Sequence, residues 1–392
     1  MEIKRPIVES KNPPSNKEVW WFDTNNEQLK RYRSGNWTAV SNTISNTNLG
    51  SAYGTVKYTT EDGTKLNIYS AILSLPNEVI FSSNEVPKDA FKSTKIEKAV
   101  LENVKTIKTG AFRNSSLSAI HLTNVESIED DAFARTELDA LHLPDSLVDI
   151  APTALLQNVN HKLSQVTGKY TIDNTFVVKD SKLLYTALRT ADIEDEHTDI
   201  YIPSSVKVLN EYSLGYLHSS YYEDENEEDA YYGWRIHIPD SVEVIRDGAF
   251  LLSSAGIGAF YGKFASDNHN YLIDDKKLIC IAAANLKSIE IPDGITSIAP
   301  RAGQKAKITK SIYIPSSVTT IGDGCFYDVQ SLEEVYVKAL TPPVLGSNVF
   351  DLQDTANTIN AKIYVPRDSV DAYKEATNWS SYANNIEGCD FN

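Results

Sequence analysis

The phrase Val104-Lys-Thr-Ile107-Lys-Thr-Gly110-Ala111-Phe112 returns along this chain, and its return decides the fold. Close copies begin at Val125, Val242 and Val318. Weaker copies span Leu147 to Leu155, Val206 to Leu214 and Ile295 to Gly303. Neighbouring copies are often about 21 to 24 residues apart, and a unit of this length cannot bury its apolar face without stacking on a neighbour. The sequence therefore predicts a repeat solenoid.

A second phrase, two apolar residues that flank a third residue, precedes most copies. It occurs as Ile120-His-Leu122, Leu141-His-Leu143, Ile200-Tyr-Ile202, Ile236-His-Ile238, Ile289-Glu-Ile291, Ile312-Tyr-Ile314, Val335-Tyr-Val337 and Ile363-Tyr-Val365. Six of these segments are followed at once by proline, which cannot donate a backbone hydrogen bond and so ends a strand. We expect one short strand per coil, stacked in parallel on the next, then a turn and a returning segment that points its Val, Ile, Ala and Phe inward.

Together, the Val-x-x-Ile-x-x-x-Ala-Phe and Ile-x-Ile-Pro phrases resemble the BspA-like class of leucine-rich repeat, found in bacterial surface antigens and related proteins. The resemblance covers roughly residues 86 to 388, and its recurrence makes it specific. It implies an adhesive or ligand-binding protein without catalytic machinery. The segments from Tyr170 to Tyr185 and from Tyr271 to Cys280 are similar to the hairpin insertions of that family, and the ending from Ile363 through Trp379 is similar to its closing cap.

The organisation that we expect has four parts. They are a small β-rich module at 1–41, a polar linker at 42–54, an amino-terminal cap of the solenoid at 55–85, and the leucine-rich-repeat solenoid at 86–388. Within the solenoid we expect insertions near 156–199, 217–234 and 256–286, and a carboxyl-terminal cap near 360–388.

The first module reads as three short strands, at Val19 to Thr24, Leu29 to Tyr32 and Gly35 to Val40. Its Trp-x-Asp-Thr, Leu-Lys-x-Tyr and Gly-x-Trp pattern resembles short modules near the start of bacteriophage fibre and other virion proteins. That resemblance implies attachment to a particle through Trp20, Trp21 and Trp37. The alternative is that these tryptophans form the core of a very small domain.

Composition excludes several functions. The net charge of −16 and the isoelectric point near 4.9 oppose binding to nucleic acid. Charged residues near the amino terminus interrupt any secretory leader, and the longest apolar run falls far short of the roughly 18 residues of a membrane span, so we expect no standard export signal and no membrane insertion. The three cysteines are too scattered for a disulfide framework, and Cys325 replaces the alanine of the repeat phrase, which predicts a small buried residue.

The strand phrase also predicts a functional surface. Because the flanking residues point into the coil, the middle residue must point to the opposite side of the sheet. These middle residues are His121, His142, Tyr201, His237, Glu290, Tyr313, Tyr336 and Tyr364. All but Glu290 are rings with apolar faces and polar edges, which suits sugars or protein partners. The alternative is that the rings only pack on one another and stiffen the sheet. The best single patch is Tyr313, Tyr336 and Tyr364.

The acidic stretch from Glu223 to Asp229 suggests calcium, but its spacing matches no calcium loop and a solvated insertion is favoured. Acidic residues of the repeat phrase, such as Asp131, Asp247 and Asp323, recur at a turn position, which indicates a structural role. A metal pair at His121 and His142 lacks a third ligand. No catalytic motif is present, so we expect no enzyme, no metal and no cofactor.

Two functions follow. In the first, the protein is a virion component whose amino-terminal module contacts other virion proteins and whose solenoid binds a host-surface glycan or protein. In the alternative, it is a bacterial cell-surface or secreted adhesin or glycan-binding protein. The missing leader and the small module favour the virion, whereas the repeat family favours the cell surface. A homo-oligomer is compatible with both, although no heptad pattern supports one.

Overall fold

The structure of the protein is a computed structural model. It describes residues 84–391, except 102, 157–162, 189–196, 216, 218–219, 223–229, 252, 354–358 and 360, and the strands that lie between residues 7 and 81. The chain divides into two compact units, Met1–Val177 and Val178–Asn392. We describe each unit by itself.

The first strands of unit 1 form a separate sheet in the order β1 (Ile7–Ser10), β2 (Trp20–Asp23), β3 (Gln28–Arg33) and β4 (Asn36–Ala39). β1 pairs with β2 in parallel, and the other two pairings are antiparallel. The structure thus has four strands where the sequence analysis expected three. The side chains of Trp20, Trp21 and Trp37 lie outside the described residues.

The segment expected to be the amino-terminal cap contains four strands. They are β5 (Val56–Thr59) and β6 (Lys65–Ile68), which form an antiparallel hairpin, and β7 (Ala71–Leu75) and β8 (Glu78–Phe81), which form another. β8 also pairs in parallel with the first repeat strand, so it is the first rung of the solenoid sheet.

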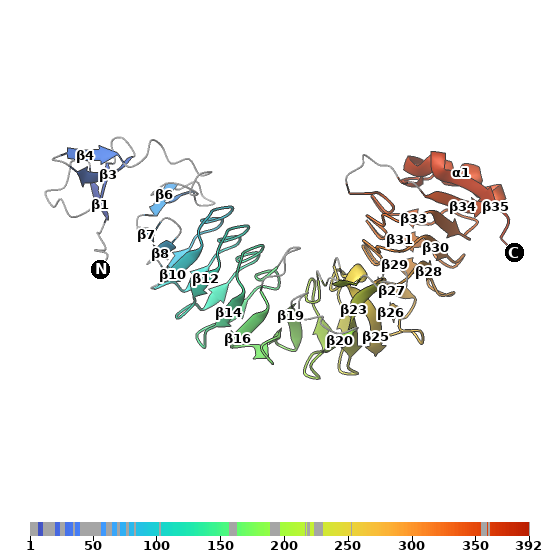
Figure 1. Ribbon diagram of the computed structural model, residues 1–392, viewed down its shortest axis with the longest axis horizontal. Helices are drawn as coiled ribbons and strands as arrows, with labels where there is room; N and C mark the ends of the chain where they lie inside the picture. Colours follow the sequence, from blue (N-terminus) through green and yellow to red (C-terminus); the bar gives the residue numbers. More distant parts are fainter. Residues whose placement is uncertain are drawn as a thin grey trace. The chain divides into compact units, whose positions relative to one another are not determined.

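The coils of unit 1 build two kinds of parallel sheet (Figure 1). The longer strands are β10 (Lys98–Leu101), β12 (Ala119–His121), β14 (Ala140–Leu143) and β16 (Gln165–Gly168), and the strand phrase occurs at β12 and β14. The returning Val-x-x-Ile phrase adds a second, two-residue strand per coil: β9 (Glu85–Val86), β11 (Thr106–Ile107), β13 (Ser127–Ile128) and β15 (Asp149–Ile150). All pairings within these sheets are parallel, which confirms the predicted solenoid.

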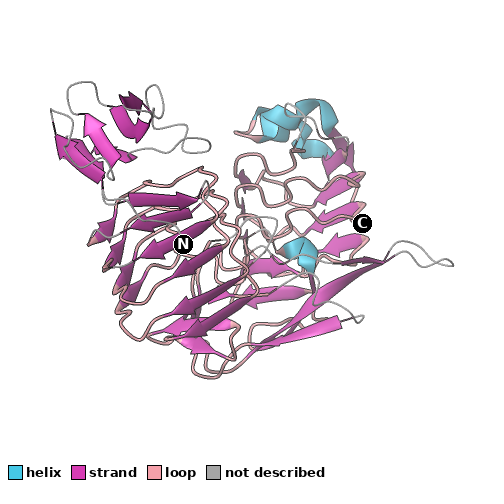
Figure 2. Ribbon diagram, turned by 60° about the vertical axis from the view of Figure 1, so that its left-hand side comes forward, coloured by secondary structure: helices cyan, strands magenta, loops and turns pink. Residues whose placement is uncertain are grey.

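Unit 2 repeats this design (Figure 2). Its longer strands form two parallel sheets. One contains β20 (His197–Tyr201), β23 (Ala230–Ile238) and β25 (Ile257–Gly262), with β22 (Ser220–Tyr222) antiparallel to β23. The other contains β28 (Ser288–Glu290), β30 (Ser311–Ile314), β32 (Glu334–Val337), β34 (Lys362–Pro366) and β35 (Ile386–Cys389).

The returning segments of unit 2 supply its remaining parallel strands. These are β19 (Lys182–Thr186), β21 (Val208–Leu209) and β24 (Val244–Ile245), then β27 (Lys277–Ile281), β29 (Ser297–Ile298), β31 (Thr320–Ile321) and β33 (Val344–Leu345).

The repeat phrase forms the core, as predicted. Val104, Ile107, Ala111 and Phe112 are at most 1% exposed. The phenylalanines stack from coil to coil, with ring centroids 5.2 Å apart for Phe91 and Phe112. The ring centroids of Phe112 and Phe133 lie 5.6 Å apart, and those of Phe326 and Phe350 lie 5.9 Å apart. Each coil therefore buries its apolar side against the next.

The two cysteines of this core are buried, as expected for Cys325. Burial raises the pKa of the Cys280 thiol to about 12 and raises that of Cys325 further above its ordinary value. Since the thiolate is the reactive form, neither sulfur is activated as a nucleophile.

Two antiparallel hairpins interrupt the coils where the sequence analysis expected insertions. The first pairs β17 (Thr171–Ile172) with β18 (Phe176–Lys179), and the second pairs β26 (Tyr271–Asp274) with β27. Each follows a Gly-Lys-aromatic turn that replaces the usual proline turn. Gly168 and Gly262 have φ of +93° and +82°, and a Cβ on either would lie 2.1 Å from a backbone carbonyl oxygen of the preceding coil. Only glycine fits both turns.

The chain ends in a helical segment that packs on the last coil. It comprises η3 (Arg367–Ser369), α1 (Val370–Glu375) and η4 (Trp379–Asn385). Trp379 is fully buried and its indole N–H donates to the carbonyl of Pro343 at 2.8 Å, while the Tyr373 hydroxyl donates to Ala339 at 2.7 Å. These contacts cover the apolar end of the array. Within the part of the chain that the structure describes, no helix has the length and apolar character of a membrane span.

Candidate recognition surface

The structure places the middle residue of each strand phrase on the outer side of its sheet. In β20, for example, Ile200 and Ile202 flank the phrase and are 3% and 4% exposed, whereas Tyr201 between them is 65% exposed. The other middle residues are exposed or half-buried: His121, His142, His237, Glu290, Tyr313, Tyr336 and Tyr364. This alternation follows from the period of two in a strand.

The tyrosines Tyr313, Tyr336 and Tyr364 form one column of stacked rings, here called the C-terminal column. Tyr313 and Tyr336 have centroids 4.7 Å apart with an interplanar angle of 2°, and Tyr336 and Tyr364 lie 4.9 Å apart at 21°. Strand register places Glu290 before the column and Glu387 after it. Because the rings stack face to face, the column presents ring edges and hydroxyl groups to solvent, not ring faces.

Carboxylates set the electrostatics of the C-terminal column. The Tyr336 hydroxyl donates to Oε2 of Glu334 at 2.9 Å. Burial, together with this hydrogen bond and the negative charge of Glu334, raises the pKa of Tyr336 well above its ordinary value. Tyr336 therefore stays a neutral phenol that donates a hydrogen bond. Glu387 forms an ion pair with Lys362 of the same face.

A second column of four rings lies on the sheet of β20, β23 and β25, and we call it the N-terminal column. Tyr201 stacks on His237 at 4.2 Å, and His237 stacks on Tyr261 at 4.7 Å. His269 then packs on Tyr261 at 4.4 Å with a tilt of 31°. The column thus holds two rings that the sequence analysis did not include.

The sequence contained a signal for one of these two rings, Tyr261. Tyr261 is followed by Gly262 where the other outward rings are followed by an apolar residue and, in most cases, proline. Phe260 before it is fully buried, so the alternation of inward and outward residues is the same. A search for an apolar residue, a ring and glycine would have found Tyr261. His269 lies in the turn between β25 and β26 and only the folded chain brings it to the column.

The N-terminal column carries a polar group that sequence reasoning also missed. Oδ1 of Asp199 lies 2.5 Å from Nε2 of His237, and its Oδ2 accepts a 2.7 Å hydrogen bond from Nη2 of Arg235. Burial acts to raise the pKa of Asp199, but the hydrogen bonds from His237 and Arg235 and the charges of both residues hold it below its ordinary value. Asp199 is therefore a carboxylate that fixes both neighbours.

In unit 1 the predicted ring residues form no column. His121 lies in register with Val100, and His142 lies in register with Thr167 and has Nδ1 3.0 Å from its Oγ1. Among the described residues no ring contact joins His121 to His142, and no group of three metal-ligating side chains is found. The two histidines therefore belong to neither ring column, and their role in ligand binding stays a prediction.

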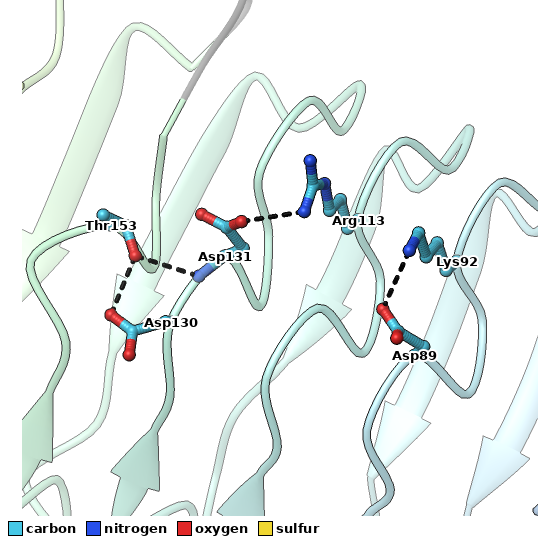
Figure 3. Close-up of polar contacts among 6 residues, drawn as sticks. All are labelled: Asp89, Lys92, Arg113, Asp130, Asp131 and Thr153. Atoms are coloured by element: carbon cyan, nitrogen blue, oxygen red, sulfur yellow. Dashed lines mark hydrogen bonds and ion pairs between the residues drawn. The ribbon is translucent and has the colours of Figure 1, made fainter.

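The acidic residues of the turns bond to neighbouring coils (Figure 3). Asp130 accepts a 2.9 Å hydrogen bond from the Thr153 hydroxyl, and Asp131 pairs with Arg113 at 3.0 Å. The sequence analysis grouped Asp131 with Asp247 and Asp323, but the equivalent residue is Asp130. Asp131 instead takes the place of the repeat glycine and has φ of +55°.

A backbone hydrogen bond from Ser347 to Asp323, 2.6 Å long, lowers the pKa of that carboxyl. The role of these carboxylates is structural, as predicted. The acidic stretch from Glu223 to Asp229 lies outside the described residues, so its calcium interpretation stays a prediction.

These coils, with a short parallel strand and a buried returning phrase in each, define a parallel β-solenoid of the leucine-rich-repeat type. The model of the BspA type leucine rich repeat region matches residues 84–214 and 279–368 with six copies, which is more than half of the chain. The chain therefore belongs to this family. No curated protein matches it.

Several solved structures are similar to this chain at low sequence identity. A leucine rich cell surface protein of Faecalibacterium prausnitzii is 20% identical over 66% of this chain and 78% of its own, with a TM-score of 0.40. The pneumococcal vaccine antigen PcpA is 16% identical over 84% and 80%, with a TM-score of 0.39. A leucine-rich repeat protein of Bacteroides ovatus is 13% identical over 85% and 97%, with a TM-score of 0.26. These similarities are too distant to assign a function.

Proposed function

We propose that this protein is a non-enzymatic recognition protein whose solenoid binds a glycan or protein on a cell surface. The observation that carries the proposal is the pair of ring columns on the outer side of the unit 2 sheets. Stacked tyrosines give a rigid surface of ring edges and hydroxyl groups, and Tyr side chains lose little conformational entropy when they bind. Such a surface suits recognition, because hydrogen bonds hold Asp199 and Tyr336 in fixed positions.

Of the two settings expected from the sequence, we favour the bacterial cell surface. The family match covers the solenoid and does not include residues 1–83, so it gives no support to a phage-like attachment module. Attachment through Trp20, Trp21 and Trp37 remains a prediction. The BspA-like resemblance itself implies bacterial surface antigens. Mass spectrometry that detected this chain in purified phage particles would reverse this choice.

The test of recognition removes the C-terminal column. Replacement of Tyr313, Tyr336 and Tyr364 by Ser should abolish binding of the labelled full chain to bacterial and epithelial cells, measured by flow cytometry, while the circular-dichroism spectrum is unchanged. The matched control is a double variant, Val244→Ser with Val344→Ser, which removes exposed apolar groups from the returning strands. This control should bind normally. Unchanged binding by the triple variant would refute a role for the column.

A further inference from the structure

Tyr201 and Tyr261 both lie on edge strands of their sheet, β20 and β25, but the ring of Tyr261 is covered by His269 on the side away from His237. β20 pairs with β23 on one side, and within the described residues no strand pairs with its other side. One face of the Tyr201 ring is therefore covered by His237, while the side chain as a whole is 65% exposed. The remaining tyrosines, Tyr261, Tyr313, Tyr336 and Tyr364, are half-buried. Tyr201 thus offers an open aromatic face.

Three planar polar groups surround Tyr201 on the same side of the sheet, one on its own strand and two on β23. Asp199 is two residues before Tyr201 on β20, and Arg235 is two residues before His237 on β23, so all four side chains share one side of the sheet. Asp199, Arg235 and His237 hold one another by hydrogen bonds, and their side chains are 26%, 31% and 27% exposed. They are fixed in position and still reachable from solvent.

The polar groups also retain unused hydrogen-bonding capacity. Among the described residues each oxygen of Asp199 has one hydrogen-bond partner, and a carboxylate oxygen can accept more than one hydrogen bond. Nε of Arg235 is buried and has no hydrogen-bond partner among the described residues. Burial of a donor without a hydrogen-bond partner costs free energy. The Arg235 guanidinium therefore differs from one that is only a surface charge.

An open aromatic face next to a fixed carboxylate and guanidinium matches a pyranose ring. The C–H groups on one side of such a sugar pack on an aromatic face, and its neighbouring hydroxyls fit planar groups that donate or accept in pairs. A nucleotide base would also stack, but the net charge of −16 opposes its phosphate. A protein partner would need a much larger contact area than one ring face provides.

We infer that Tyr201, with Asp199, Arg235 and His237, binds one pyranose unit of a surface glycan. This inference rests on the proposed recognition function and specifies its ligand class. The free face of Tyr201 takes the apolar side of the sugar, and Asp199 and Arg235 take its hydroxyls. His237 supports Tyr201 from below and holds Asp199.

A glycan array probed with the labelled full chain tests this assignment. At least one pyranose-containing oligosaccharide should be retained, and its affinity should then be measured by calorimetry for four variants. Tyr201→Ser should weaken binding by roughly tenfold or more, because the stacking face is lost. Tyr201→Phe keeps the face and should stay within about threefold of the parent chain. Asp199→Asn should weaken binding, and Val344→Ser, on a returning strand outside both columns, should leave it unchanged.

The outcomes separate this inference from the proposed function. Retention of no glycan, or equal binding by Tyr201→Ser and the parent chain, overturns the sugar site. If cells still bind the parent chain and not the triple tyrosine variant, recognition stands and only the sugar site fails. If cells also fail to bind, both fail. Because Tyr201 is mostly exposed, its replacement should leave the unfolding midpoint unchanged, which excludes misfolding as the cause of any loss.

Discussion

The two units of this solenoid are alike inside and different outside. Unit 1 buries Phe91, Phe112 and Phe133 in one stacked row, and unit 2 buries Phe326 and Phe350 in the same way. On the outer side of its longer strands, unit 1 places residues such as Val100, His121 and Thr167, and no stacked column forms among those described. Unit 2 places two ring columns there.

The difference shows that the coil does not need rings on its outer side in order to fold. The interior is set by the repeat phrase, since every coil must fill the same space against its neighbours. The outer positions are in contact with solvent and can vary without loss of the core. Among the described residues the ring columns occur in unit 2 alone, so they are not a requirement of the fold.

The largest expected effect is on the shared interior. Phe112→Ala in unit 1 and Phe326→Ala in unit 2 each remove a fully buried ring that stacks on a neighbour. Each change should lower the free energy of unfolding by about 3 to 5 kcal/mol, because it leaves a cavity in the core. Urea unfolding followed by circular dichroism measures this loss. A loss below about 1 kcal/mol in either unit would show that the interiors are not equivalent.

A smaller effect should appear at the glycine turns that precede the two hairpins. Gly168→Ala and Gly262→Ala each place a Cβ 2.1 Å from a carbonyl oxygen, at positive φ, and should cost about 2 kcal/mol or more. The matched control is Gly324→Ala, where φ is +56° and the nearest atom lies at 3.5 Å, so only backbone strain of about 1 kcal/mol is expected. The same unfolding experiment compares them. Equal losses at all three glycines would mean that the close carbonyl contact has no effect.

The smallest effect concerns the outer side, where the units differ. Tyr336→Ala removes a ring that stacks on two others and should cost about 1 kcal/mol. His121→Ala removes an exposed side chain with no ring neighbour and should change stability by less than about 0.5 kcal/mol. Thermal unfolding resolves the two variants. Equal losses of stability in the two variants would show that ring stacking in the column does not stabilise the fold. The outer sides of the two units would then not differ in their contribution to stability.

Sequence reasoning recovered the repeat, the inward residues and the hairpin insertions, because each depends on a pattern within one coil. The returning Val-x-x-Ile phrase forms a second parallel strand that the pattern did not reveal, since two residues carry too little periodicity to identify a strand. Asp199 and Arg235 were missed because neither occupies the middle of the strand phrase. Their importance comes from the neighbours that the folded chain gives them.

The sequence by itself therefore determined the solenoid, its family and the residues of its core, since apolar residues at fixed spacing must turn inward wherever the phrase occurs. Only the tertiary structure decided which outward rings meet. Tyr201 pairs with His237, and His237 pairs with Tyr261, across insertions of unequal length, whereas His142 lies in register with Thr167 and not with another ring. Contacts between coils depend on which strands become neighbours, and the length of the chain between those strands does not reveal that.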